Sequence, residues 1–84
     1  MTYRNFINGL CDAGINASTN GYQLRKALGV STASLRLWLK EGLPCERNEK
    51  GHMVIDAQEA ICWLVNTGRV QYAGVLHDHF LTTN

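Results

Sequence analysis

Residues 21–38, which read GYQLRKALGVSTASLRLW, decide the fold of this chain. They contain two short segments whose apolar residues recur every three to four positions, as in amphipathic helices. Gly29 separates the segments, and glycine tolerates the positive φ that a tight turn between helices requires. Arg25 occupies a position where a small residue usually faces the second helix, so its side chain must lean out of the crossing. Five apolar side chains form the inner faces: Leu24, Leu28, Val30, Leu35 and Trp38.

The flanking residues set the ends of both helices. Asn20 offers an N-cap with a glutamine three positions later, which predicts the start of the first helix. Ser31 or Thr32 caps the second helix, which ends before Gly42 because glycine suits a left-handed C-cap and a proline follows two residues later. These signals predict a helix-turn-helix over residues 20–41.

The next residues predict a hairpin and another helix. An apolar strand at residues 53–55 and a partner at residues 45–47 flank a polar turn, which indicates a β-hairpin over residues 44–55. Asp56, with a glutamate three positions later, caps a helix over residues 56–66. That helix is apolar on nearly every side, so other helices or a second copy of the protein must cover it.

Helices are expected at both ends of the chain. Three-to-four spacing of apolar residues predicts a C-terminal helix over residues 69–81, through which the protein could also form a homodimer. An amphipathic stripe predicts an N-terminal helix that packs within the same chain. The stripe consists of Tyr3, Phe6, Ile7, Leu10 and Cys11.

Length and composition describe one ordinary globular domain. The 84 residues are 45% hydrophobic, no apolar run approaches the roughly 18 residues of a membrane span, and no signal-peptide pattern is evident. Three cysteines without zinc or redox spacing indicate reduced thiols in a cytoplasmic protein, with Cys11 and Cys62 in the core. We expect no metal site at His77, Asp78 and His79, because adjacent residues point in different directions from a helix. We expect no enzyme and no cofactor, because the short chain has no spaced catalytic constellation and no phosphate-binding loop.

Charge is distributed unevenly although the net charge is only +1. Residues 25–50 contain six of the eight basic side chains and three acidic ones, a local net charge of +3, whereas the rest of the chain carries −2. A surface that faces phosphates produces this polarity. On charge alone, a solvated face with chance clustering explains it nearly as well.

The second helix of the pair has the layout of a DNA recognition helix. At about 100° per residue, Leu35, Trp38 and Leu39 share an apolar back. Arg36 on the front has the reach for a bidentate guanine contact. Lys40 suits a phosphate, whereas Ser31 and Thr32 suit a phosphate or a base. The outward Leu37 indicates either a thymine methyl contact or a protein contact. The whole front surface comprises Ser31, Thr32, Ala33, Arg36, Leu37 and Lys40.

The order of elements resembles the winged-helix DNA-binding domains of the MerR-type, phage excisionase and terminase small-subunit group. The resemblance spans residues 21–64 and depends on the helix pair, an aromatic late in the second helix, a Gly-Leu-Pro exit, a short wing and an Asp-capped helix. It implies that wing residues contact the DNA backbone or minor groove, although Glu46 and Glu49 dilute the charge there. These wing residues are Arg47, Asn48, Lys50 and His52.

The predicted fold class is mainly α, a winged helix-turn-helix with a short β-hairpin wing and extra N- and C-terminal helices, in a single domain of residues 1–84. The predicted function is sequence-specific binding of double-stranded DNA by a transcriptional regulator or excisionase-like factor of a phage or mobile element. Arg25 and Lys26 join the DNA surface. One alternative is an inhibitor or interaction module that binds a phage or host protein without binding DNA. Another is a packaging factor like a terminase small subunit.

Overall fold

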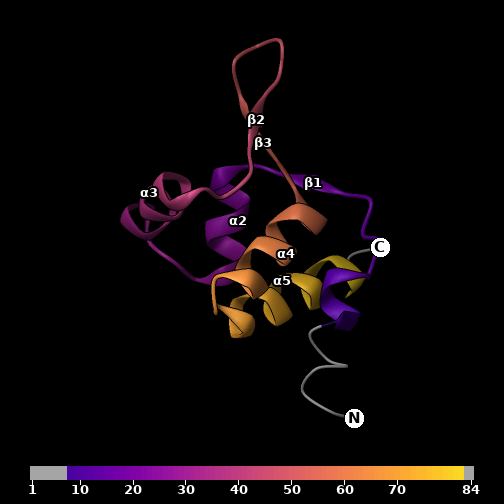
Figure 1. The fold of residues 1–84 in the computed structure, drawn as a ribbon. Coiled ribbons are helices and arrows are strands. Elements are labelled where there is room, and N and C mark those ends of the chain that lie inside the picture. Colours follow the sequence, from indigo (N-terminus) through magenta and orange to yellow (C-terminus); the bar gives the residue numbers. More distant parts are fainter. Residues whose placement is uncertain (1–7, 83–84) are drawn as a thin grey trace.

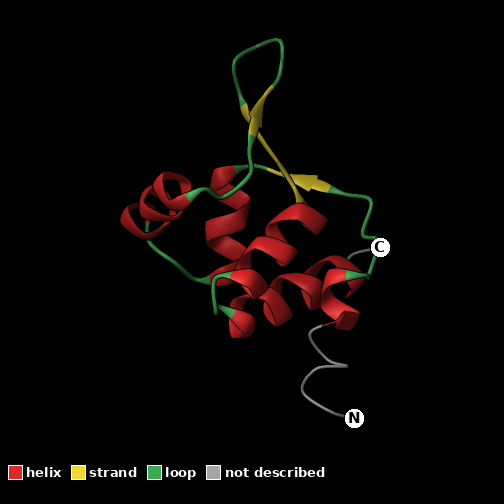
Figure 2. Ribbon diagram, in the orientation of Figure 1, coloured by secondary structure: helices red, strands yellow, loops and turns green. Residues whose placement is uncertain are grey.

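The computed structural model describes residues 8–82, where a mainly helical body carries a small three-stranded antiparallel sheet (Figure 1, Figure 2). Residues 8–11 are helical, while Tyr3, Phe6 and Ile7 of the predicted N-terminal stripe lie outside the described residues. The remaining elements are, in order, β1 (Ser18–Thr19), α2 (Gly21–Leu28), α3 (Thr32–Glu41), β2 (Glu46–Arg47), β3 (Met53–Asp56), α4 (Ala57–Asn66) and α5 (Val70–Thr82).

Local hydrogen bonds fix the helix ends where the sequence predicted them. The side-chain oxygen of Asn20 accepts a hydrogen bond from the backbone N–H three residues later at 2.8 Å, and Asp56 caps α4 in the same way at 2.9 Å. Ser31, rather than Thr32, caps α3 at 3.1 Å. Gly42 then ends α3 with a left-handed φ of 117°, a conformation that glycine adopts without a Cβ clash.

Helix α4 forms the centre of the core, and its Ala60 and Ile61 are fully buried. Helix α5 lies along α4 (Figure 1) and contributes Ala73 and Leu76, which are fully buried as well. Helix α2 adds the buried Leu24 to the same core. The C-terminal helix therefore covers α4 within one chain.

The side-chain amide of Gln58 on α4 makes three hydrogen bonds to the N-terminal segment. Its Nε2 donates to the carbonyl oxygens of Leu10 and Cys11, both at 2.9 Å, and its Oε1 accepts from the Ile15 N–H at 2.9 Å. The end of a helix leaves carbonyl groups without partners, and Gln58 supplies donors for two of them. Cys11 and Cys62, expected in the core, are half-buried at its edge.

One strand was missed by the sequence prediction. The sequence analysis assigned no strand before Asn20, but Ser18 and Thr19 form β1, which pairs antiparallel with β3. Ser18 lies opposite Asp56, and Thr19 lies opposite Ile55. The pairing satisfies backbone groups on an edge of β3 that would otherwise lack partners. The predicted two-stranded hairpin is therefore part of a sheet in the order β1-β3-β2.

Candidate nucleic-acid interface

Helix α3 has two faces of different chemistry. Leu35 and Trp38 are buried against the domain, and Leu39 is half-buried. The opposite face is exposed to solvent, as the helical periodicity predicted. The exposed side chains are Thr32, Ala33, Arg36, Leu37 and Lys40.

Among the described residues, the cations of this exposed face have no carboxylate partner. Within residues 8–82 the structure contains no ion pair or side-chain hydrogen bond of Arg36 or Lys40. Lys26 on α2 is also exposed, whereas Arg25 is half-buried with its guanidinium 5.8 Å from the ring centre of Tyr22. The Arg25 guanidinium thus packs near the Tyr22 ring of its own helix. The charges of Arg36 and Lys40 on α3 remain available to an external anion.

The start of α3 is fixed by its own side chains. The Ser31 hydroxyl oxygen accepts from the Ser34 N–H, and the same hydroxyl donates to the Ser34 hydroxyl at 3.2 Å. Ser31 is exposed, but its hydroxyl already serves as the cap. Thr32, next to it and also exposed, is the better placed of the two for an external contact.

The other end of α3 is held by a cluster that we name the Arg69 clamp: Glu41, Trp38, Trp63, Arg69 and Tyr72. The guanidinium of Arg69 pairs with the Glu41 carboxylate at 2.7 Å and lies 5.5 Å and 5.1 Å from the ring centres of Trp38 and Trp63. Tyr72 packs against Trp38 with 5.3 Å between ring centres. Sequence reasoning gave Arg69, Trp63 and Tyr72 no part in positioning α3, because their sequence distance from it gives no local signal.

The hairpin of β2 and β3 projects from the helical body (Figure 1), with Glu46 opposite Val54. Its tip is ordered by Asn48, whose side-chain oxygen accepts from the backbone N–H groups of Lys50 and His52, both at 3.0 Å. Asn48 therefore shapes the turn, a role the sequence did not assign to it. All four predicted hairpin contacts are exposed: Arg47, Asn48, Lys50 and His52.

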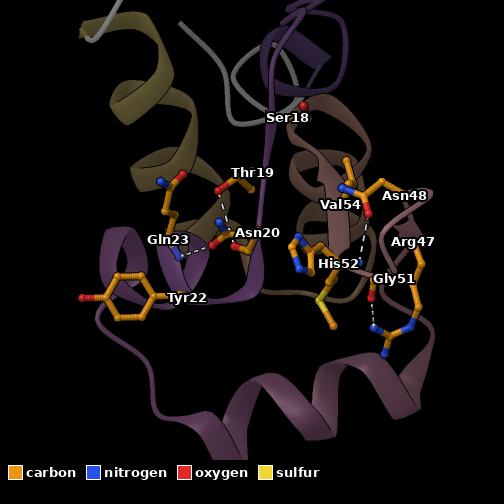
Figure 3. A pocket seen from close by; sticks show the side chains of 11 residues that line it. Ser18, Thr19, Asn20, Tyr22, Gln23, Arg47, Asn48, Gly51, His52 and Val54 are labelled. Carbon is orange, nitrogen blue, oxygen red and sulfur yellow. Dashed lines mark hydrogen bonds between the residues drawn. The ribbon is translucent and has the colours of Figure 1, made fainter.

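An open hollow of about 650 Å³ lies between the hairpin and the start of α2 (Figure 3). Arg47 and His52 line it from the hairpin, and Tyr22 and Gln23 line it from α2. Arg47 is oriented by a hydrogen bond from its Nη1 to the Gly51 carbonyl at 2.9 Å. Sequence reasoning missed Tyr22 and Gln23 at this place, because their approach to the hairpin depends on the pairing of β1 with β3.

The described residues bring together no group of three or more His, Cys, Asp or Glu side chains suited to a metal. His77 lies beside Asp78 at 3.5 Å.

Burial, reinforced by the neighbouring Cys62 thiol, raises the pKa of Cys11 above its ordinary value. Within residues 8–82 no helix has the length and hydrophobicity needed to cross a membrane.

Comparison with known proteins adds no relative: no protein-family model, no curated protein and no solved structure matches this chain.

Proposed function

We propose that this protein binds double-stranded DNA sequence-specifically as a winged helix-turn-helix domain, with α3 in the major groove and the β2–β3 hairpin as the wing. One observation carries the proposal: α3 exposes short polar and cationic side chains that the described residues leave unpaired, while its apolar back is buried, its first turn is capped by Ser31 and its C-terminal end is paired with Arg69. A recognition helix needs such a front and such support.

Three exposed polar side chains of the front, Thr32, Arg36 and Lys40, have chemical roles in this proposal. Arg36 donates two hydrogen bonds to the O6 and N7 acceptors of a guanine. Thr32 donates to a phosphate or a base edge near the helix start, and Lys40 neutralises a phosphate. On the wing, Arg47 and Lys50 contact the backbone or the minor groove, and Glu46 and Glu49 in the same hairpin weaken that attraction. Arg25, Lys26 and His52 are further DNA contacts in this proposal.

The biological role that we propose is transcriptional regulation or excisionase-like assembly in a phage or mobile element, within the cytoplasm. A homodimer through α5 is part of this proposal, because Val75 and Leu81 remain 48% and 54% exposed on that helix. Paired subunits gain affinity by engaging two half-sites. A packaging role like that of a terminase small subunit uses the same DNA contacts.

A second candidate function is binding to a phage or host protein instead of DNA. The observations that favour it are two large exposed apolar side chains: Leu37, 54% exposed within the front of α3, and Tyr22, 63% exposed on α2. The net charge of +1 points the same way, because a near-neutral protein has little non-specific attraction to DNA.

The test is selection of binding sites from a randomised duplex library, followed by titration of the selected duplex across a salt series. We expect Arg36→Ala to lose specific binding by about 5- to 150-fold, the range of one bidentate base contact. Its melting temperature should stay near that of the native protein, because Arg36 is exposed and unpaired among the described residues.

Arg36→Lys is the matched variant. It keeps the charge and therefore the salt dependence, but it loses the bidentate fork and with it the preference for guanine. Full specific binding by Arg36→Ala would contradict the assignment of α3 as the recognition helix. Failure of the native protein to select any duplex, even at low salt, would favour the protein-binding candidate.

A further inference from the structure

The exposed face of α3 carries an apolar row beside its cationic row. Ala33 and Leu37 are four residues apart, so they lie one above the other on the helix surface. Both are exposed, and Leu37 keeps 54% of its surface accessible. Arg36 and Lys40 form the adjacent row at the same spacing. Leu37 is thus an apolar group without cover on the face that we propose to enter the major groove.

The neighbouring charges decide which occupant fits this apolar row. An apolar protein surface that covered Leu37 would also desolvate Arg36 and Lys40, which is costly because the described residues offer them no carboxylate partner. A DNA major groove supplies phosphates and guanine acceptors for both cations. The apolar group that its base edges offer is the C5 methyl of thymine.

We propose that Leu37, supported by Ala33, is a specificity-determining residue that selects a thymine methyl close to the base pair read by Arg36. This inference rests on the proposed DNA-binding function and deepens it. Consecutive residues of a helix are separated by about 1.5 Å along its axis, and consecutive base pairs by about 3.4 Å. The thymine is therefore expected at the same base-pair step as the guanine or at the next one.

Replacing thymine by uracil in the selected duplex tests this contact, because the exchange removes one methyl group and leaves the base pair intact. Each thymine is exchanged singly. We expect one or two positions near the guanine at which the native protein loses about fourfold in affinity, the value of one buried methyl or methylene group. Leu37→Ala should bind the thymine duplex several-fold more weakly and no longer distinguish thymine from uracil at those positions.

Asn66→Ala is the control. Asn66 is exposed at the C-terminal end of α4, outside the proposed DNA surface and the proposed dimer helix, so its truncation should leave the affinity and the preference for thymine unchanged. Equal affinity of the native protein for every thymine and uracil duplex would overturn the inference, as would a thymine preference retained by Leu37→Ala. In both cases specific binding by the native protein would leave the proposed function standing.

Failure of the proposed function gives a different result. The native protein then selects no duplex at all, so no thymine-to-uracil comparison discriminates. Leu37 would in that case be assigned to a protein contact, which also overturns the thymine inference.

Discussion

Replacing Arg69 with alanine tests how the end of α3 is held against the rest of the domain. The substitution removes the ion pair with Glu41 and both contacts between the guanidinium and the rings of Trp38 and Trp63. It leaves the backbone of Arg69 in place, where its N–H donates to the Leu64 carbonyl at 2.7 Å. The expected loss of stability therefore comes from the side chain of the Arg69 clamp.

The magnitude follows from the exposure of the partners. The side chains of Arg69 and Glu41 are 23% and 38% exposed, so the ion pair is worth roughly 0.2–1 kcal/mol. Each cation–π contact at such a site adds about 0.5–1 kcal/mol. The free energy of unfolding should fall by roughly 1–3 kcal/mol in total, which lowers the melting temperature of a domain of this size by about 4–8 °C per kcal/mol.

Thermal melting and urea denaturation measure the loss of stability, and three further variants separate the contribution of the ion pair from that of the ring contacts. Arg69→Met keeps the apolar stem, Glu41→Gln removes only the ion pair, and the double variant gives their coupling energy. Lys26→Ala is the control, because this exposed cation has no side-chain partner within residues 8–82. Melting of Arg69→Ala within 2 °C of the native protein would refute the clamp. So would a Glu41→Gln variant as unstable as Arg69→Ala.

Three further predictions concern the core and the thiols. Gln58→Met removes three hydrogen bonds to the backbone of the N-terminal segment and should cost about 2–4 kcal/mol in urea unfolding; an unchanged midpoint would contradict this. Trp38→Ala truncates a buried ring and should cost about 3–5 kcal/mol or prevent folding, as circular dichroism would show; native-like melting would exclude the assigned helical face. Cys45 is exposed and should react with a thiol reagent before Cys11, whose pKa burial raises. Because the pKa of Cys11 is raised in the folded state, its neutral thiol adds to the free energy of unfolding below the pKa of Cys11 in the unfolded chain, and this contribution is lost as the pH rises through the pKa in the folded protein. In urea denaturation at increasing pH, a Cys11→Ala variant should lack this loss.

The helices of this fold were predictable because their signals are local. The caps at Asn20 and Asp56 and the left-handed Gly42 each act within one helical turn, so a short window of sequence contains the whole interaction. The division of α3 into two faces was predictable for the same reason. Hydrophobic spacing alone placed Trp38 inside and Arg36 outside.

The contacts that assemble these helices were not predictable, because their partners are far apart in the chain. Ser18 and Thr19 pair with β3, but two polar residues have no hydrophobic alternation that would indicate a strand. Gln58 reaches backbone groups 43 to 48 positions away. Arg69 is 28 positions from Glu41. An arginine just before a helix gives no local signal of so distant a partner.

The candidate interface depends on these distant contacts more than its simple chemistry suggests. With a net charge of +1, non-specific attraction to phosphates is weak, so specific DNA binding in the proposed mode needs several contacts made simultaneously. Simultaneous contact requires that α3 and the hairpin keep a fixed relative position. The Arg69 clamp fixes the C-terminal end of α3, and β1 ties the hairpin to the start of α2 through β3. Residues that touch no DNA in the proposed mode thereby determine whether the exposed face of α3 recognises it.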